Sequence, residues 1–476
     1  MPKIVNRLMK PFLQYYAMSW LSDAGYKDRI DGQIRGHIRK VAQTGIGRKL
    51  GVTPDTPIRE VPFTHYDFYH PFFDNPKDGD FIYPLQDYLR VLTSGTMGKP
   101  KTFLLPKTGL WNSIQKTGMT FQFLCTHDGQ KVTYEVGDVV YHNMPGGQFI
   151  SGFYYDIITE KHVGWIEEVP DPNLSFQDKV DYFLAHYKEI DIAYMTVTTL
   201  LDQICPRIKE PIRLKAFLTT DRSAYALKDR IKEVTGSYPK TIFGSTETMF
   251  IALPSIEYPG CFFFDWRVVY PEFLPERIRL ENNEETTDPV EEVVPMTDVK
   301  VGEIYQLITT PYGNDLVRYA MPDLVECVAL NDRVIGSSIP VFRYYARADN
   351  LIVLHNFTRI NEDELIDVLN RSGIGYVDFT ALREIDYSRE YMKMYIELKE
   401  PLNVEEASTR INKQLLEYDK DWRDLSDMLQ YYPLKVELLP KGTFNRYLQR
   451  KTGNPKISRI NMPLENLALL KDSTAQ

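Results

Sequence analysis

Short apolar segments alternate with helical segments through the middle of the chain, and no other feature limits the possible folds as strongly. Helical periodicity marks residues 110–123, 176–187 and 224–235, and Gly236 follows the last of these segments. Short extended segments lie between or after them, at residues 138–144, 192–195, 214–218 and 241–243. Strands that alternate with helices pair into a sheet covered by helices. The sequence therefore predicts an α/β core.

The pattern of elements changes near residue 350. A helix at 361–370, a strand at 392–398 and a helix at 404–418 then indicate a smaller α+β unit. At about 100–200 residues per domain, a chain of 476 residues accommodates roughly two to four domains. We therefore expect a domain boundary between residues 345 and 350.

The N-terminal segment has some features of a secretion signal. Basic residues at positions 3, 7 and 10 precede the apolar stretch 11–18, but Gln14 and two tyrosines interrupt that stretch. An amphipathic helix explains the segment better, and residues 1–60 as a whole have helical character. No run of about 18 apolar residues occurs, so we expect no membrane-spanning helix.

Charge and cysteine content narrow the possible partners. The chain has 56 basic and 65 acidic residues and a net charge of −9, which disfavours nucleic acid as a partner. Residues 281–298 hold seven acidic side chains and no basic one, which predicts an exposed loop.

The four cysteines are widely spaced and form no C-x-x-C pair. They predict free thiols in a cytoplasmic protein without a zinc site.

The most informative local sequence is residues 88–106. An apolar strand leads into a loop of hydroxyl, glycine and lysine residues, and a second strand follows at once. Glycines let backbone N–H groups approach an anion, and lysines add positive charge. The loop is not a Walker loop, because Pro100 follows Lys99 and no helix begins there. Taken alone, such a loop is also typical of a hairpin turn with surface lysines.

The complete string, Thr93-Ser94-Gly95-Thr96-Met97-Gly98-Lys99-Pro100-Lys101, favours the phosphate-binding interpretation. It resembles the Thr-Ser-Gly-Thr-Thr-Gly-x-Pro-Lys loop of the adenylate-forming superfamily, which includes acyl-CoA synthetases, adenylation domains and luciferases. Only Met97 departs from that pattern. The resemblance implies that the loop binds the phosphates of ATP through Thr93, Ser94, Gly95, Thr96, Gly98, Lys99 and Lys101.

A second motif follows in the order that this superfamily has. Phe243-Gly244-Ser245-Thr246-Glu247 resembles the superfamily's Tyr-Gly-x-Thr-Glu motif. The resemblance implies that Phe243 stacks on adenine and that Gly244 and Ser245 line the nucleotide site. It also implies that Thr246 contacts the α-phosphate and that Glu247 holds Mg²⁺, a cation that prefers oxygen ligands. Alone, the segment is equally typical of a helix start capped by Ser245 or Thr246.

Three further segments fit the same resemblance. The segment 316–324 is similar to the superfamily's Arg-Tyr-x-x-Gly-Asp region, which implies that Asp323 accepts hydrogen bonds from ribose. The segment 345–352 is similar to its hinge, with Arg347 on ribose or phosphate and Asp349 as the pivot. Residues 139–147 stand where the superfamily has its acyl-pocket loop, which implies that the substrate contacts Tyr141, His142, Gly146 and Gly147. A lone histidine such as His142 is also often structural.

The resemblance implies two domains of unequal size. Residues 1–345 would form a large N-terminal α/β domain of mixed sheets flanked by helices. Residues 346–350 would be the hinge, and residues 351–476 a small, mobile α+β lid domain. The basic stretch 435–459, with seven basic residues and one acid, is either a solvated face or the part of the lid that closes on phosphate.

The C-terminal motif departs from the superfamily. Its Pro-x-x-x-x-Gly-Lys-x-x-Arg pattern places a lysine between substrate carboxylate and phosphate, but Asn445-Arg446 stand here in place of Gly-Lys. Arg446, Lys441 or Lys451 would have to supply the positive charge. An Arg is not equivalent to a Lys, because its charge is spread over a planar fork.

These residues predict a two-step ligase that uses ATP and Mg²⁺. In the first step a carboxylic acid becomes an acyl-adenylate and pyrophosphate is released. In the second the acyl group passes to the thiol of CoA or, in a second hypothesis, to the amine of an amino acid. The sequence is nearest in style to phenylacetate-CoA ligases and hormone-conjugating acyl-amido synthetases. A third hypothesis is a nucleotide- or acyl-adenylate-binding protein without catalysis, because the C-terminal lysine is missing.

Overall fold

The computed structural model describes residues 3–23, 25–93, 101–143, 150–161, 166–197, 199–278, 280, 285–347, 351–354, 358–386, 389–429, 431–451 and 456–474. The described residues divide into two compact units, and each is considered by itself. The first unit comprises residues up to Thr93 together with Lys101–Tyr344, and the second begins at Tyr345.

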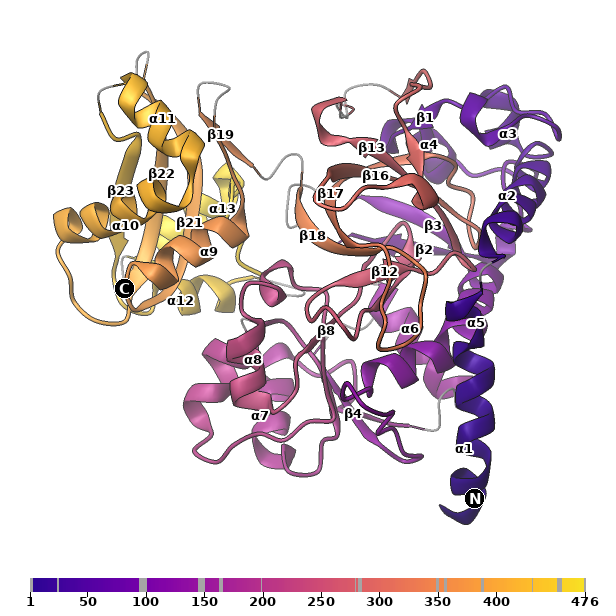
Figure 1. Ribbon diagram of the computed structural model, residues 1–476, viewed down its shortest axis with the longest axis horizontal. Coiled ribbons are helices and arrows are strands. Elements are labelled where there is room, and N and C mark those ends of the chain that lie inside the picture. The colour runs from indigo at the N-terminus through magenta and orange to yellow at the C-terminus, as the bar shows by residue number, and fades with distance from the viewer. Residues whose placement is uncertain are drawn as a thin grey trace. The chain divides into compact units, whose positions relative to one another are not determined.

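One of the sheets of the first unit is a parallel sheet of five strands, two of which, β4 and β8, are labelled in Figure 1. Its order is β5-β4-β6-β7-β8, with bounds Glu167–Val169, Val139–His142, Ile192–Tyr194, Ala216–Thr219 and Pro239–Thr241. The helices of this region are α5 (Lys107–Cys125), α6 (Ile150–Lys161), α7 (Phe176–His186) and α8 (Lys228–Thr235). The predicted α/β core is therefore confirmed. Helix α8 begins four residues later than expected, after a short 3₁₀ turn, and ends where Gly236 adopts a left-handed conformation with φ of 80°.

The two faces of this sheet pack against different helices. Tyr141 and Phe217 point to the face covered by α7, where Phe183 joins their cluster. Val140 and Leu218 point to the opposite face and cluster with Cys125 of α5. Because both faces are buried, the strands are short continuous apolar runs and show no alternation of polar and apolar residues.

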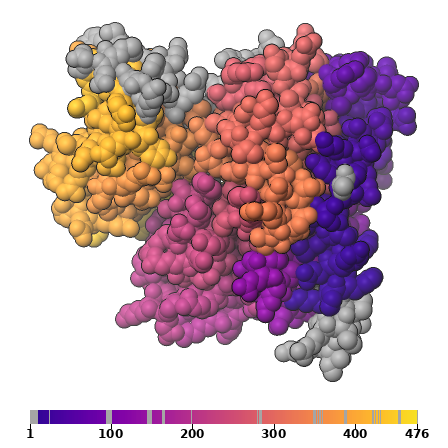
Figure 2. All heavy atoms as spheres, in the orientation of Figure 1, coloured from indigo at the N-terminus to yellow at the C-terminus, as the bar shows by residue number. Residues whose placement is uncertain are grey.

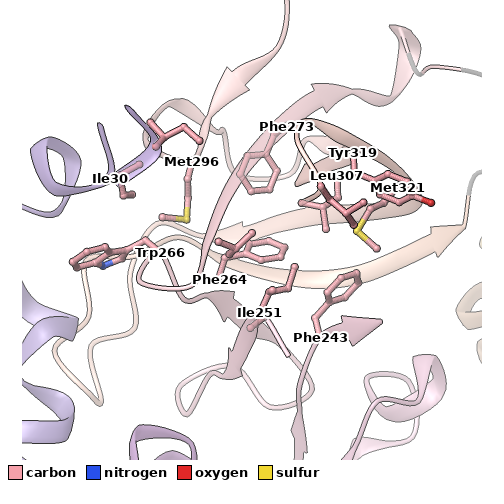
Figure 3. Close-up of a cluster of buried hydrophobic side chains, with 14 of the residues drawn as sticks. Ile30, Phe243, Ile251, Phe264, Trp266, Phe273, Met296, Leu307, Tyr319 and Met321 are labelled. Carbon is pink, nitrogen blue, oxygen red and sulfur yellow. The ribbon is translucent and has the colours of Figure 1, made fainter. Parts of the chain in front are cut away.

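A larger mixed sheet completes the first unit. Its main path is β11-β12-β18-β17-β16-β13-β15, with bounds Ala252–Pro254, Phe262–Phe264, Val341–Arg347, Tyr319–Ala329, Ile304–Pro311, Val269–Pro275 and Val294–Pro295. Strands β1 (Phe63–Thr64) and β14 (Thr286–Thr287) attach at its side. The aromatic rings of its core interlock, as Figure 3 shows around Phe264 and Phe273, and the Phe273 and Phe342 rings stack 4.7 Å apart. The expected acidic loop is therefore partly strand, since β14 and β15 lie within it.

Three helices, α1 (Lys3–Met18), α2 (Tyr26–Val41) and α3 (Gly45–Lys49), precede β1 and confirm the helical character predicted for residues 1–60. Helix α4 (Tyr66–Asp74) follows β1. The helices coloured indigo lie along one side of the first unit in Figure 2. In the described parts of the chain, no helix is both long and apolar enough to cross a bilayer.

The second unit is an α+β structure. A long antiparallel hairpin of β21 (Tyr376–Asp386) and β22 (Arg389–Leu398) adds β23 (Leu434–Leu439) as a parallel neighbour. A smaller hairpin joins β19 (Ile352–Leu354) to β20 (Thr358–Ile360). The helices are α9 (Glu362–Arg371), α10 (Val404–Tyr418), α11 (Lys420–Leu429), α12 (Thr443–Gln449) and α13 (Leu464–Asp472). Asn361 and Glu364 form a capping box at the start of α9.

The cysteines behave as the spacing predicted. All four are free thiols, and Cys125, Cys261 and Cys327 are buried. Burial in apolar surroundings raises the pKa of the Cys125 thiol. A buried thiol of this kind acts as a small apolar side chain in the core.

Candidate active site

The predicted strand–loop–strand segment is a hairpin. Strand β2 (Tyr88–Leu92) pairs with β3 (Thr102–Pro106) in antiparallel register. Two hydrogen bonds close the base of the loop. The Thr93 N–H donates to the Lys101 carbonyl at 2.9 Å, and the Lys101 N–H donates to the Thr93 hydroxyl at 2.8 Å. The other predicted phosphate-binding residues, Ser94, Gly95, Thr96, Gly98 and Lys99, lie outside the described residues.

The base of this hairpin is fixed from two sides. The Lys101 ammonium lies 4.6 Å from the centre of the Tyr66 ring, a cation–π distance that holds the lysine near the loop. On the other side, the Tyr88 hydroxyl donates to Asp315 at 2.6 Å, and the Ile82 N–H donates to the same carboxylate at 2.6 Å. Burial raises the pKa of Asp315 to about 6. The two strands therefore present the loop from a well-anchored frame.

The second motif also forms a hairpin. Strands β9 (Gly244–Ser245) and β10 (Met249–Phe250) pair antiparallel, and Thr246 and Glu247 lie half-buried in the turn between them. The helix start proposed as an alternative for this segment is therefore wrong.

Hydrogen bonds hold this turn in place. The Ser245 hydroxyl accepts from the Thr248 N–H and the Thr248 hydroxyl accepts from the Ser245 N–H, both at 3.2 Å. The Asn314 side chain donates to the Glu247 carbonyl at 2.7 Å. The turn is thus fixed both within itself and from a neighbouring segment.

Phe243, expected to stack on adenine, is itself well packed. Its ring is 8% exposed and lies 5.4 Å from the Phe262 ring and 6.0 Å from the Phe264 ring. The Tyr344 ring lies 6.4 Å away and nearly parallel to it. Figure 3 shows Phe243 at one end of the buried cluster, near Ile251. Its contact with adenine stays a prediction.

In the third motif, Arg318 has a structural role and Asp323 is the predicted ribose contact. Arg318 is fully buried and makes two hydrogen bonds to the Glu272 carboxylate, at 2.9 and 3.0 Å, and a third to the Val61 carbonyl. Asp323 lies within β17, where the pairing with β16 shifts between Gln306 and Ile308. Such a bulge re-aims side chains and tolerates a proline, which explains Pro322. Asp323 is therefore not a turn residue, and its contact with ribose stays a prediction.

The predicted hinge is only partly visible. Arg347 ends strand β18, but its side chain lies outside the described parts of the structure, as does Asp349. The hinge role of residues 346–350 therefore stays a prediction.

Two of the three candidate cations of the second unit, Arg446 and Lys441, have different surroundings. The Arg446 guanidinium donates to the Ser473 carbonyl at 2.7 Å and to the Lys441 carbonyl at 3.2 Å. Lys441 is exposed in the turn between β23 and α12, directly before Gly442. Arg446 is therefore engaged in holding the end of the chain, whereas Lys441 stands on the surface.

A cavity of about 160 Å³ lies within the first unit, against the side of the parallel sheet opposite to α7. Its floor comes from alternate residues of the strands, its walls from α5 and α6, and its remaining side from the segment that contains β10 and β11. The floor residues are Val140, His142, Glu168, Ile192, Tyr194 and Leu218. Pockets of this kind, apolar with few polar groups, bind small organic ligands.

The cavity adjoins the second motif. Ile242 lines it on one side of the motif and Phe250 lines it on the other. These residues flank the hairpin that carries Thr246 and Glu247. The cavity also lies toward the carboxyl ends of the parallel strands, where α/β sheets bind ligands.

Three of the ionisable side chains that line the cavity are an Asp, a His and a Glu. Asp265 is paired with Arg267 at 2.6 Å. His142 is buried, and its Nε2 has no hydrogen-bond partner. Burial, with a smaller effect from Lys179, lowers the pKa of His142 to about 4, so the ring is neutral at pH 7. Burial raises the pKa of Glu168 to about 7, and its Oε2 likewise has no partner.

The predicted substrate residues separate in the structure. His142 lines the cavity as expected, but the Tyr141 side chain points to the other face of the sheet and donates to the Lys179 carbonyl at 2.9 Å. Successive residues of a strand point to opposite faces, so both could not face the substrate. Gly146 and Gly147 lie outside the described residues. The predictions missed Glu168, which pairs with Val140, and Tyr194, which pairs with His142. No local sequence signal would have found them, because their position depends on which strands pair.

A bound Mg²⁺ could draw its ligands from the side chains that the structure describes. Among them, no cluster of three or more His, Cys, Asp or Glu side chains could hold a metal by itself. Mg²⁺ commonly binds through one or two carboxylates together with substrate phosphates. Glu247, at the tip of an anchored turn, fits that role.

Comparison with known families matches one part of the chain. The model of the GH3 family central domain matches residues 262–346. This stretch runs from β12 to β18 in the larger sheet. A comparison with curated protein sequences finds no match.

Solved structures match nearly the whole chain. AtGH3.15 acyl acid amido synthetase in complex with 2,4-DB aligns with a TM-score of 0.71 and 15% identity, over 97% of this chain and 96% of the other. A 2-hydroxyisobutyryl-CoA ligase in complex with R3-HIB-AMP aligns with a TM-score of 0.65 and 15% identity, over 96% and 94% of the two chains. At 15% identity these likenesses bear on the fold alone, and they confirm the predicted fold.

Proposed function

We propose that this protein activates a carboxylic acid with ATP. A carboxylate oxygen attacks the α-phosphorus, the bond from that phosphorus to the bridging oxygen of the β-phosphate breaks, and pyrophosphate leaves. The product is an acyl-adenylate. The observation that carries the proposal is the apolar cavity that adjoins the hairpin bearing Thr246 and Glu247. An acid held in that cavity would have its carboxylate next to the motif.

Two anions meet in this reaction, so positive charge and hydrogen-bond donors lower its barrier. In this proposal the residues from Thr93 to Lys101 hold the phosphates, and Thr246 contacts the α-phosphate. Phe243, Gly244, Ser245, Asp323 and Arg347 line the nucleotide site. Bound Mg²⁺ would neutralise phosphate charge, held by Glu247. Lys441 is the better candidate for the C-terminal cation, because Arg446 is hydrogen-bonded to Ser473.

The second step transfers the acyl group to an acceptor. A nucleophile attacks the carbonyl carbon, AMP leaves, and the nucleophile loses its proton. The match to the GH3 central domain and the likeness to an acyl acid amido synthetase favour an amine, which would form a C–N bond. The likeness to a CoA ligase supports the thiol of CoA. We give the amine preference, with CoA as the alternative.

The arrangement of the chain suggests how the two steps alternate. We include in the proposal a large domain of residues 1–345, a hinge at 346–350 with Asp349 as the pivot, and a lid domain of residues 351–476. Closure of such a lid excludes water and completes the catalytic groups. The free thiols of the chain favour a reducing cytoplasm as its place of action.

A pyrophosphate-release assay tests the proposal. Aryl and alkyl acids are screened with ATP and Mg²⁺, first alone and then with CoA or with each amino acid. We expect release that depends on the acid, and product formation with one class of acceptor. Glu247→Gln is expected to reduce release by about 100-fold or more, because it loses a charged ligand. Nucleotide binding without release, for every acid, would favour a binding protein.

A further inference from the structure

Two polar atoms in the cavity lack a partner. Among the described residues that line it, Glu168 Oε2 and His142 Nε2 are the buried side-chain atoms without a hydrogen bond. The third ionisable group, Asp265, is satisfied by Arg267. A buried polar atom without a partner costs about 1–3 kcal/mol, more for a charged group. Both atoms therefore favour a ligand that supplies hydrogen bonds.

The register of the parallel sheet places these two residues at different depths. His142 pairs with Tyr194 at the carboxyl end of the strands, whereas Glu168 pairs with Val140, one side-chain layer deeper. Two residues along a strand span about 6.6 Å. His142 is thus nearer to the edge where ligands enter α/β sheets, and Glu168 lies farther inside.

The two residues also differ in their position across the sheet. Glu168 is on β5, which forms one edge of the sheet, and the other edge strand, β8, leads into the hairpin of Glu247. The cavity floor extends from β5 to Leu218 of β7, three strand spacings or roughly 14 Å. An acid whose carboxylate meets the hairpin would therefore direct its far end toward Glu168.

Among the described residues around Glu168, none supplies positive charge to its carboxyl group. Ile158, Ile166 and Tyr155 line the cavity with it, and its pKa is raised by burial without an opposing contribution from any cation. A carboxyl group in such a place is stabilised by accepting a hydrogen bond from a ligand.

We infer that the cavity is built for a carboxylic acid that carries a hydrogen-bond donor at its far end, and that Glu168 accepts that hydrogen bond. The substrate class is an elongated, largely apolar or aromatic acid with a terminal hydroxyl or N–H group. An acid with a methyl group at the same place would leave Glu168 without a partner. A site built to bond a hydroxyl rejects an analogue that lacks it more strongly than an apolar pocket rejects a change of size. This inference rests on the proposed function, because it assumes that the cavity holds the acid.

The test compares two acids of equal shape. The acids are para-hydroxyphenylpropionate and para-methylphenylpropionate, and their affinity is measured by calorimetry while turnover is measured by pyrophosphate release. We expect the wild-type protein to prefer the hydroxyl acid by about tenfold or more. Glu168→Leu should abolish or reverse that preference, and Glu168→Gln, which keeps an acceptor, should retain part of it. Glu167→Gln is the matched control, since Glu167 is the exposed neighbour on the same strand.

The outcomes separate this inference from the proposed function. Equal affinity of the wild-type protein for both acids, or an unchanged preference in Glu168→Leu, would overturn the role of Glu168. Should Glu168→Leu not fold, the same decision rests on Glu168→Gln and on the wild-type preference. If the hydroxyl acid binds preferentially but no acid causes pyrophosphate release, the proposed reaction fails while the binding role of Glu168 stands.

Discussion

At the scale of single residues, Glu168 combines burial with an ionisable group. Its carboxyl oxygen faces an apolar cavity, and burial raises its pKa from 4.5 to about 7. By contrast, the buried Arg318 of the first unit is paired with Glu272. A group that a fold keeps without a partner is a candidate for ligand binding, because stability alone would favour its replacement by an apolar residue.

The raised pKa of Glu168 predicts a pH-dependent stability. The unfolded chain binds this proton with a pKa near 4.5 and the folded chain with a pKa of about 7. The protonated group's contribution is complete below pH 4.5 and is lost as the pH rises through 7. Glu168→Gln should therefore raise the free energy of unfolding by about 1–3 kcal/mol at pH 8 and change it far less at pH 4.

Urea denaturation at the two pH values measures this effect. Glu167→Gln, at an exposed position of the same strand, should change the free energy of unfolding by less than about 0.5 kcal/mol at either pH. An equal change for Glu168→Gln at both pH values would contradict the assigned titration.

At the scale of elements, the close packing of β9 against β10 explains why glycine is needed at position 244. A Cβ at Gly244 would lie 2.6 Å from the Met249 carbonyl oxygen and 2.8 Å from the Phe250 ring. Only glycine lets the two strands meet at this point, and their pairing positions the turn that carries Thr246 and Glu247. The packing of the two strands thus explains the glycine at position 244 without any role in ligand binding.

Gly244→Ala should separate these strands. We expect a loss of about 1–3 kcal/mol in the free energy of unfolding and a large loss of ATP-dependent activity. The control is Gly36→Ala in helix α2, where the added Cβ meets nothing within 4 Å. That change should stabilise the protein by about 0.5–1 kcal/mol, since alanine favours a helix. Thermal denaturation measures both, and a stable, active Gly244→Ala variant would contradict the packing argument.

At the scale of the whole molecule, the second unit carries the cations that the reaction would need. Residues 435–459 are strongly basic, but hydrogen bonds divide these side chains by role. The Arg459 guanidinium binds Asp378 and Glu362, and Arg446 binds the Ser473 carbonyl. Lys441 stands exposed on the turn before α12. In the proposed mechanism, this lysine would approach the substrate when the lid closes.

Two substitutions distinguish these roles. Lys441→Ala should lower the rate of pyrophosphate release by about 10- to 100-fold without a change in melting temperature, because it removes a charge and no packing. Arg446→Ala should lower the melting temperature, because the Ser473 carbonyl loses its donor. Full activity of Lys441→Ala combined with a stable, inactive Arg446→Ala would reverse the assignment.

Local sequence was sufficient to predict many of the helices and strands of this protein. The helices α5, α7 and α10 and the strands beside them follow from periodicity, since an element that buries one face must repeat its apolar residues at fixed intervals. The order of the motifs carried the resemblance to the adenylate-forming superfamily, and the strand–loop–strand frame of residues 88–106 follows from its glycines and flanking strands.

Only the tertiary structure determined which face of the parallel sheet lines the cavity. Nothing local to Tyr141 and His142 indicates which of them faces the cavity, because that depends on the helices that cover each side of the sheet. The same is true of Glu168, which lies next to Val140 only because two parallel strands pair in one register. From sequence alone, a charged residue on an edge strand is expected to be solvated. In the structure Glu168 is half-buried, and residues of α6 line the cavity together with it.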